Sequence, residues 1–462
     1  MSSVLTPILR PRPFKPPSPF LKMTRSLHHQ SPYFRIEELT VPTQHSRERP
    51  ATLDRASGSR DDEVRMHVKR YIPNSNKPSG KLETGFGDVT IIGAQANGFP
   101  KECYEPFWED LCEQLRERGK GVRGIWVADM VGQGRSGVLK EALLGPDQSW
   151  WDHGRDLLFL INQFQRELPH PIVGVGHSVG ASHLWTRAKD VTRAHLSLLH
   201  PRLLHSLVFI DPIMQPDVKI HTALARLSTN RRDIWPSRKA AAEAFRGSKF
   251  YQKWDPRVLE KWIEFGLRDL PTEQYPLPPG AHKDEPPVTL TTTVAQEVYF
   301  YLRAYYRDRR LLQDDEELPE NLDPPFDMPE GRQLYERLPE IKPSVQFVFG
   351  SKSEASPPES RQDKMQKTGV GFGGSGGAQK GRVKEAVLDC GHLVGMEKPK
   401  ECAEVTAGFL KEELERWEAR EKRRDEAVAG LSRKERVGIN ALWREKLGVE
   451  EPGKGKKKET KL

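Results

Sequence analysis

The sequence predicts an α/β protein, in which a mostly parallel β-sheet is covered by helices on both faces. Three observations predict this class. Short apolar runs alternate with amphipathic helical patterns over residues 32–212. One of these runs leads directly into a Gly-His-Ser-Val-Gly turn at residues 176–180, with helix-compatible sequence after it. Strand patterns return at residue 343, after a long helical stretch. Because parallel strands are joined by helical crossovers, this alternation indicates a sheet with both faces covered.

The first part of the chain divides into an arm and a core. Residues 1–31 are rich in proline and basic side chains, so we expect a disordered N-terminal extension. Residues 32–212 form the first part of the core, which includes the apolar strand before the turn at residues 176–180. The other expected strands are residues 34–42, 64–72, 88–94, 124–129 and 204–211, and the expected helices are residues 104–118 and 150–168.

Three further segments follow the first part of the core. Residues 213–342 combine helical patterns with proline-rich joints and little strand character, which predicts an inserted helical cap. Residues 343–417 complete the core, with strands at 344–350 and 382–388 and a closing helix at 399–417. Residues 418–462 are dominated by charge and are expected to form an exposed tail.

Composition excludes several classes of function. No run of 18 apolar residues exists, so we expect no membrane span. The 4 cysteines fit neither a disulfide framework nor a metal-ligand spacing, so no metal site is expected. The net charge of +8 is concentrated in the two terminal arms, which argues against nucleic acid as a partner.

The turn at residues 176–180 has the Gly-x-Ser-x-Gly pattern of a nucleophile elbow. Such a turn strains the backbone at the serine and projects its hydroxyl above the sheet, and glycines on either side allow the strand and the helix to approach closely. Ser178 is therefore the candidate nucleophile, and the backbone amide of Val179 is a candidate oxyanion donor. Residues 373–377 match the same pattern, but they lie in a glycine-rich run with no strand before it, which is typical of a loop.

A serine hydroxyl needs a base and an orienting acid, which follow the serine along the chain in this architecture. His392 is the candidate base, because it comes between the last strand and the closing helix. Asp211, at the end of the strand after the elbow, is the favoured acid. Glu354 is the alternative; it follows the penultimate strand, where Ser353 stands at about the place expected for an aspartate.

Other residues have less specific roles. The loop after the strand at 88–94 contains Asn97, whose backbone amide is the second candidate oxyanion donor. His177 is expected to pack beside the strand and His183 to be structural, and residues 129–136 are expected to form a structural loop. Aromatic residues of the cap either line an apolar acyl pocket or pack the cap, namely Trp235, Phe245, Tyr299, Phe300 and Tyr301.

Residues 94–102, 231–238 and 368–377 resemble fungal peroxisomal α/β-hydrolases. That group includes the yeast peroxisomal lipase, the hydrolases of AK-toxin biosynthesis and the acyl-CoA thioesterase of mycophenolic acid biosynthesis. The resemblance spans roughly residues 32–417 and implies the α/β-hydrolase fold, with an eight-stranded sheet and an inserted cap. It also implies an ester or thioester hydrolase whose acid follows the strand after the elbow, which independently favours Asp211.

The sequence thus predicts a serine hydrolase that cleaves small-molecule esters or acyl thioesters and is thioesterase-like or lipase/esterase-like. This acyl-transfer chemistry implies no cofactor. The alternative is an inactive hydrolase fold that serves as a binding or assembly module through its charged tail. Residues 185–193 resemble an extra segment in the helix that supports Ser178. The terminal Thr460-Lys461-Leu462 resembles a peroxisomal import signal, which predicts binding to the import receptor and a peroxisomal rather than a cytoplasmic location.

Overall fold

The computed structural model describes residues 24–54, 64–74, 87–184, 202–216, 219–281, 284–304 and 326–449. The expected extra segment at residues 185–193 and the Thr460-Lys461-Leu462 signal lie outside these residues, so both stay predictions. The chain divides into two compact units, residues 1–413 and residues 414–462. None of the helices in the described residues has the length and apolar character that a membrane span requires.

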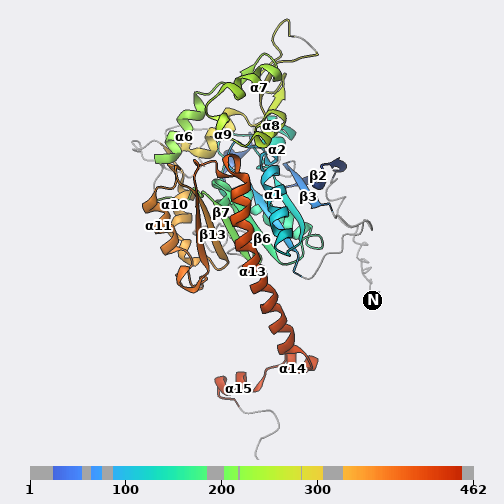
Figure 1. The fold of residues 1–462 in the computed structure, drawn as a ribbon, viewed down its shortest axis with the longest axis vertical. Helices are drawn as coiled ribbons and strands as arrows, with labels where there is room; N and C mark the ends of the chain where they lie inside the picture. The colour runs from blue at the N-terminus through green and yellow to red at the C-terminus, as the bar shows by residue number, and fades with distance from the viewer. Residues whose placement is uncertain are drawn as a thin grey trace, which may run out of the picture. The chain divides into compact units, whose positions relative to one another are not determined.

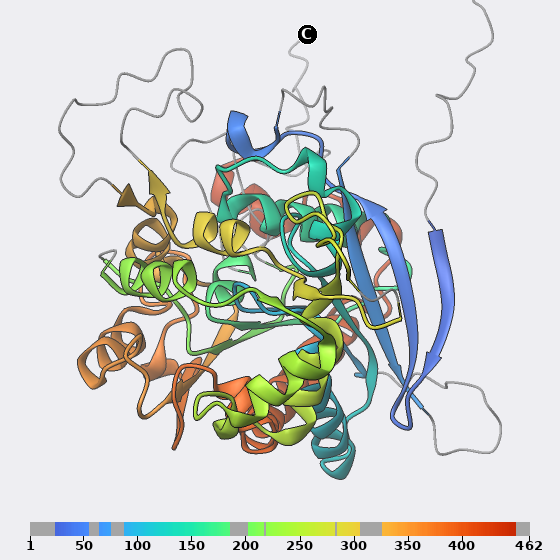
Figure 2. The same ribbon diagram turned by 90° about the horizontal axis from the view of Figure 1, so that it is seen from above.

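The first unit is built on a nine-stranded sheet (Figures 1 and 2). Its first three strands are antiparallel to their neighbours, and the six from β5 to β14 run parallel to one another. The strands in spatial order are β1 (Thr24–Gln30), β2 (Phe34–Pro42), β3 (Arg65–Pro73), β5 (Val122–Ala128), β4 (Val89–Ala94), β6 (Ile172–His177), β7 (Ser206–Ile210), β13 (Ser344–Gly350) and β14 (Val383–Leu388). The mostly parallel sheet predicted from the sequence is confirmed, with all eight expected strands and one more.

The additional strand, β1, corrects the prediction of a disordered extension over residues 1–31 in its last part. Residues 1–23 lie outside the described residues, so there the prediction stays untested. Residues 24–30 instead pair antiparallel with β2, from Thr24 opposite Thr40 to Gln30 opposite Arg35. The prolines of the arm all precede residue 24, so this stretch keeps every backbone N–H that a β-ladder needs. The exposed edge of β2 supplies the partner.

Helices pack against the sheet through apolar stripes. In α1 (Glu105–Glu117) the side chains of Phe107, Leu111 and Leu115 recur at four-residue intervals, and all three are fully buried. The other helices of the core are α2 (Gly134–Leu139), α3 (Trp150–Gln163), α4 (Val179–Leu184), α11 (Pro358–Lys367), α12 (Val394–Glu397) and α13 (Pro399–Val428). The expected boundary between core and tail, at residues 417 and 418, falls inside α13.

Between β7 and β13 the chain forms the segment that we expected to be a cap. Figure 1 shows most of its helices gathered over one end of the sheet, with the last of them beside α11. They are α6 (Lys219–Thr229), α7 (Arg238–Gly247), α8 (Pro256–Phe265), α9 (Val294–Tyr301) and α10 (Pro329–Glu336). The sequence did not predict its short strands, β8 (Ile234–Trp235), β9 (Leu267–Asp269), β10 (Val288–Leu290), β11 (Arg303–Ala304) and β12 (Phe326–Asp327).

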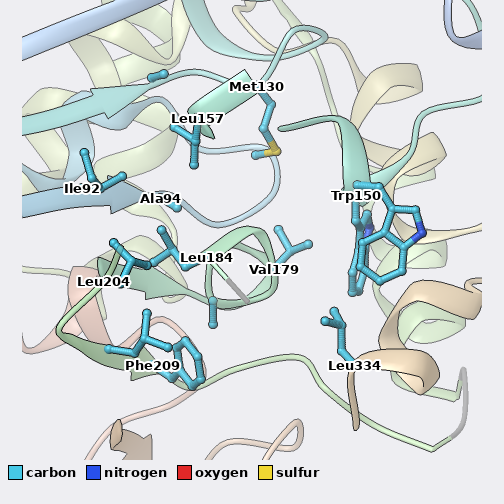
Figure 3. Close-up of a cluster of buried hydrophobic side chains, with 14 of the residues drawn as sticks. Ile92, Ala94, Met130, Trp150, Leu157, Val179, Leu184, Leu204, Phe209 and Leu334 are labelled. Atoms are coloured by element: carbon cyan, nitrogen blue, oxygen red, sulfur yellow. The ribbon is translucent and has the colours of Figure 1, made fainter. Parts of the chain in front are cut away.

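One hydrophobic core cluster surrounds the turn from β6 into α4 (Figure 3). Val179 and Leu184, at the two ends of α4, are buried with Ile92 of β4 and Phe209 of β7. Trp150 joins the same cluster at the start of α3. The residue that follows Ser178 is therefore anchored in this buried cluster.

The second unit contains the end of α13, then α14 (Arg433–Val437) and α15 (Ala441–Leu447). A capping box begins α14: the Ser432 hydroxyl accepts from the backbone of Glu435, whose carboxylate accepts from the backbone of Ser432.

Candidate active site

Ser178 stands alone between β6 and α4 with a φ of 56°, in the left-handed region that side chains disfavour. Its backbone N–H donates to the carbonyl of Ile210 in the neighbouring strand, at 2.8 Å. The flanking glycines are required by packing. A Cβ on Gly180 would lie 2.1 Å from the carbonyl oxygen of Ala94, and one on Gly176 would lie 2.5 Å from the carbonyl carbon of Gly180. The turn therefore has the backbone strain and the close approach that the sequence pattern predicts.

His392 lies between Ser178 and Asp211. Its Nε2 is 3.0 Å from the Ser178 hydroxyl oxygen, and its Nδ1 is 2.5 Å from Oδ2 of Asp211. Asp211 is fully buried, and the Ser353 hydroxyl donates to the same carboxylate oxygen. Burial opposes ionisation of this carboxyl, but the hydrogen bonds from His392 and Ser353 outweigh it and hold the pKa of Asp211 below its ordinary value. An ionised acid, an imidazole and a hydroxyl thus form one hydrogen-bonded row.

Glu354, the alternative acid, is not part of this row. Its side chain is exposed. Ser353, which stands at about the place where an aspartate was expected, contributes its hydroxyl to Asp211 instead. The strand end that approaches His392 Nδ1 is therefore that of β7.

Asn97 lies in the loop after β4, where its side chain is held from two sides. Asn97 Nδ2 donates to the backbone carbonyl of Glu297 in α9 at 2.9 Å, and Asn97 Oδ1 accepts from Gln133 Nε2 at 2.5 Å. The backbone N–H of Gly98 donates to Oε1 of the same Gln133 at 2.8 Å. Within the described residues, the backbone N–H of Asn97 meets no protein acceptor. The N–H of Val179 opens α4 and has no intrahelical acceptor either.

Two residues that sequence reasoning did not single out therefore shape this loop. Gln133 lies in the loop at residues 129–136, and only its contacts show that it holds Asn97 and Gly98. Glu297 belongs to α9, is buried, accepts from the Ser228 hydroxyl at 2.6 Å and pairs with Arg231. Burial raises the pKa of Glu297. Neither residue lies in a recognisable motif, so the sequence offers no local signal for them.

Asp129, at the end of β5, ties the neighbouring loops together. It is fully buried and accepts from Lys101 Nζ at 2.5 Å, from Gln95 Nε2 at 3.2 Å and from the backbone of Arg135 at 2.9 Å. The Ser136 hydroxyl donates to its backbone carbonyl at 2.9 Å. These bonds hold the loop after β4 against the loop after β5, which is the structural role expected for residues 129–136.

The cap aromatics do not form one group. Trp235 and Phe245 pack edge to face, with ring centroids 5.2 Å apart. Phe300 packs edge to face on His183 with centroids 5.9 Å apart, whereas Tyr299 lines a cavity of about 590 Å³ beside Arg231. Packing within the cap accounts for the first two residues. Among the described residues, no group of three His, Cys, Asp or Glu side chains is placed to hold a metal ion.

Comparison with known proteins agrees with this fold. Residues 96–405 match the model of the alpha/beta hydrolase family. The chain is 32% identical over 447 residues to the type I acyl-CoA thioesterase mpaH of Penicillium roqueforti, covering 92% of this chain and 97% of that protein. It is 34% identical over 423 residues to the type I acyl-CoA thioesterase mpaH' of Penicillium brevicompactum, covering 86% of this chain and 92% of that one.

A solved structure shows the same fold. The peroxisomal alpha-beta-hydrolase Lpx1 of Saccharomyces cerevisiae matches with a TM-score of 0.59 at 16% identity, covering 90% of this chain and 96% of that one. The elbow, the row of three side chains, the sheet order and these matches lead to one conclusion: the chain belongs to the α/β-hydrolase family.

Proposed function

We propose that this hydrolase cleaves carboxylic esters or acyl thioesters, with Ser178 as nucleophile, His392 as general base and acid, and Asp211 as the orienting acid. One observation carries the proposal: the hydrogen-bonded row from the Ser178 hydroxyl through both ring nitrogens of His392 to the Asp211 carboxylate. A serine hydroxyl needs such a partner, because it is a weak nucleophile at its own pKa.

The reaction follows from the same geometry. Ser178 Oγ attacks the acyl carbon as His392 Nε2 takes its proton, and the imidazolium is stabilised by Asp211. The backbone amides of Asn97 and Val179 donate to the oxyanion. His392 then gives the proton to the leaving thiol or alcohol. Water, deprotonated by His392 in turn, hydrolyses the acyl-enzyme and releases the acid.

An acyl-CoA thioester is the favoured substrate class. Support comes from the two Penicillium relatives, which are named as acyl-CoA thioesterases and match over most of their length. An oxygen ester or glyceride is the second candidate. The same triad accepts either leaving group, so the distinction depends on what surrounds the acyl carbon rather than on the triad.

The test holds one acyl group constant and presents it as its CoA thioester, its p-nitrophenyl ester and its glyceride. We expect the wild type to prefer the thioester and Ser178→Ala to lower kcat about a million-fold, as removal of a triad serine does elsewhere. Preference for the ester or glyceride would make the protein an esterase or lipase instead.

A fluorophosphonate probe separates this proposal from a binding module. The probe should label the wild type at Ser178 and leave Ser178→Ala unlabelled. A folded wild type that neither labels nor turns over a substrate would contradict the proposal and support an inactive hydrolase fold.

A further inference from the structure

A chain of buried hydrogen bonds runs beside the candidate triad and contains none of its side chains. Its centre is His177, the residue before Ser178. His177 Nε2 lies 2.9 Å from the backbone carbonyl oxygen of His392, and His177 Nδ1 lies 2.7 Å from the Tyr104 hydroxyl. That hydroxyl also accepts from the backbone N–H of Ala96 at 2.9 Å. His177, Tyr104 and Ala96 are all at most 3% exposed.

The chemistry of the groups sets the direction of each bond. A carbonyl oxygen only accepts, so His177 Nε2 must carry a proton. Burial, with the neighbouring His392, lowers the pKa of His177 to about 3, so the ring is neutral near pH 7 and holds that proton alone. Nδ1 then has to accept, and Tyr104 donates to it. The phenolic oxygen keeps a lone pair for the N–H of Ala96, so every group in the chain is satisfied in one arrangement only.

The chain joins three loops that carry different parts of the proposed catalytic site. His177 ends β6 immediately before the nucleophile. His177 binds the backbone carbonyl of His392, which lies 215 positions later in the sequence and whose imidazole faces Ser178. Tyr104 ends the turn Lys101–Tyr104 before α1 and holds Ala96, the neighbour of Asn97. The base and one oxyanion donor are thus fixed to the elbow through a single imidazole.

We propose that His177 and Tyr104 are positioning residues that set the distance from His392 to Ser178 and the orientation of the Asn97 amide. This role rests on the proposed hydrolase function. It gives His177 a part in the reaction rather than the packing role expected from the sequence. Because misplacement of a reacting group by about 1 Å can lower a rate about 100-fold, loss of this chain should reduce kcat more than it raises KM.

Three variants test the chain. His177→Phe keeps a ring of similar size but removes both hydrogen bonds, and we expect kcat to fall about 10- to 100-fold at nearly unchanged KM. His177→Gln places an amide N–H where it can reach the carbonyl of His392, and should recover most of the lost kcat. Tyr104→Phe leaves His177 Nδ1 and the N–H of Ala96 without a partner, and should lower kcat while leaving the bond to His392 intact.

Matched controls come from the same fold. His205, just before β7, has its Nε2 2.7 Å from the backbone carbonyl oxygen of Glu413. Since β7 runs toward Asp211, His205 lies at the opposite end of the strand from the site. His205→Phe removes the same kind of buried bond and should cost stability without lowering kcat. Tyr71 of β3, whose fully buried hydroxyl donates to Oε1 of Glu105 at 3.0 Å, provides Tyr71→Phe as the control for Tyr104→Phe.

The variants are compared by kcat and KM on the substrate that the wild type prefers, with urea unfolding to fix the folded fraction. Nitrogen-15 NMR measures the protonation of the His177 ring, whose signals are those missing from the spectrum of His177→Gln. We expect a protonated Nε2 and an unprotonated Nδ1 that do not titrate between pH 5 and pH 8. A kcat loss in His177→Phe that His205→Phe does not share, with recovery in His177→Gln, supports the role. Unchanged kcat in His177→Phe, or an unprotonated Nε2 on His177 in the wild type, overturns the positioning role.

These measurements distinguish failure of the positioning role from failure of the proposed hydrolase function. An active wild type whose His177→Phe variant keeps its kcat overturns only the positioning role. A wild type that turns over no substrate and leaves Ser178 unlabelled overturns the hydrolase function and the positioning role together.

Discussion

Ser178 and Asp211 are the two non-glycine residues with positive φ in the part of the chain that the structure describes, at 56° and 39°. Each lies at the carboxyl end of a parallel strand, and each faces His392. A backbone held in this region costs free energy and persists only where its surroundings enforce it. Both residues that contact the His392 imidazole thus have a strained backbone. Such strain lowers stability, so its presence at both partners supports a functional role for this site.

Asp211 and Glu354 are distinguished by a pair of amide substitutions. Asp211→Asn keeps the shape of the side chain but removes the negative charge that orients His392 and stabilises its imidazolium form, so kcat should fall about 10,000-fold. Glu354→Gln alters an exposed side chain outside the hydrogen-bonded row and should leave kcat unchanged. Steady-state kinetics at neutral pH on the preferred substrate measure both. A large loss in Glu354→Gln with little change in Asp211→Asn would assign the acid to Glu354.

At the scale of elements, local patterns predicted what local physics decides. Short apolar runs located eight strands, the spacing of the apolar residues located α1, and the two glycines located the turn between β6 and α4. Features that depend on segments distant in sequence were missed or left open. Asn97 and Glu297 are 200 positions apart, and the approach of the β7 strand end to His392, which favours Asp211 over Glu354, arises only from packing. The short cap strands have two or three residues, too few to show a period of two.

The close approach of α4 and β4 can be tested by comparing two glycines in helices. Gly180→Ala would bring a Cβ to 2.1 Å from the Ala94 carbonyl oxygen, so strand and helix must separate, and we expect a loss of about 1–3 kcal/mol in the free energy of unfolding. Gly408, within α13, has no atom within 4 Å of an added Cβ. Gly408→Ala should therefore stabilise the protein by about 0.5–1 kcal/mol. Urea unfolding measures both changes, and an equal loss in both variants would refute this account.

Across the whole molecule, several histidines are buried in the neutral form. His153 and His183 pack edge to face with ring centroids 4.8 Å apart, and His177 lies beneath the site. Burial lowers the pKa of His153 and of His177 to about 3, and lowers that of His183 well below its ordinary value. Between about pH 3 and the ordinary value of 6.5, the unfolded chain binds protons at these positions that the folded chain excludes. Their contribution to stability is present above pH 6.5 and is lost as the pH falls below it.

His153 offers the cleanest test of this linkage, because it lies outside the proposed catalytic row and neither of its ring nitrogens has a hydrogen-bond partner in the described residues. Each such histidine adds up to about 1.4 kcal/mol per pH unit to the slope of the unfolding free energy below the ordinary pKa. His153→Phe should therefore make the decline between pH 6.5 and pH 4.5 shallower by up to that amount. The measurement is urea unfolding across this range, above the ordinary pKa values of carboxyl groups. His45→Gln, at an exposed position, is the control for the loss of a histidine outside the core. If His153→Phe leaves the slope unchanged, the imidazole of His153 takes up a proton in the folded state, and the acid sensitivity must arise elsewhere.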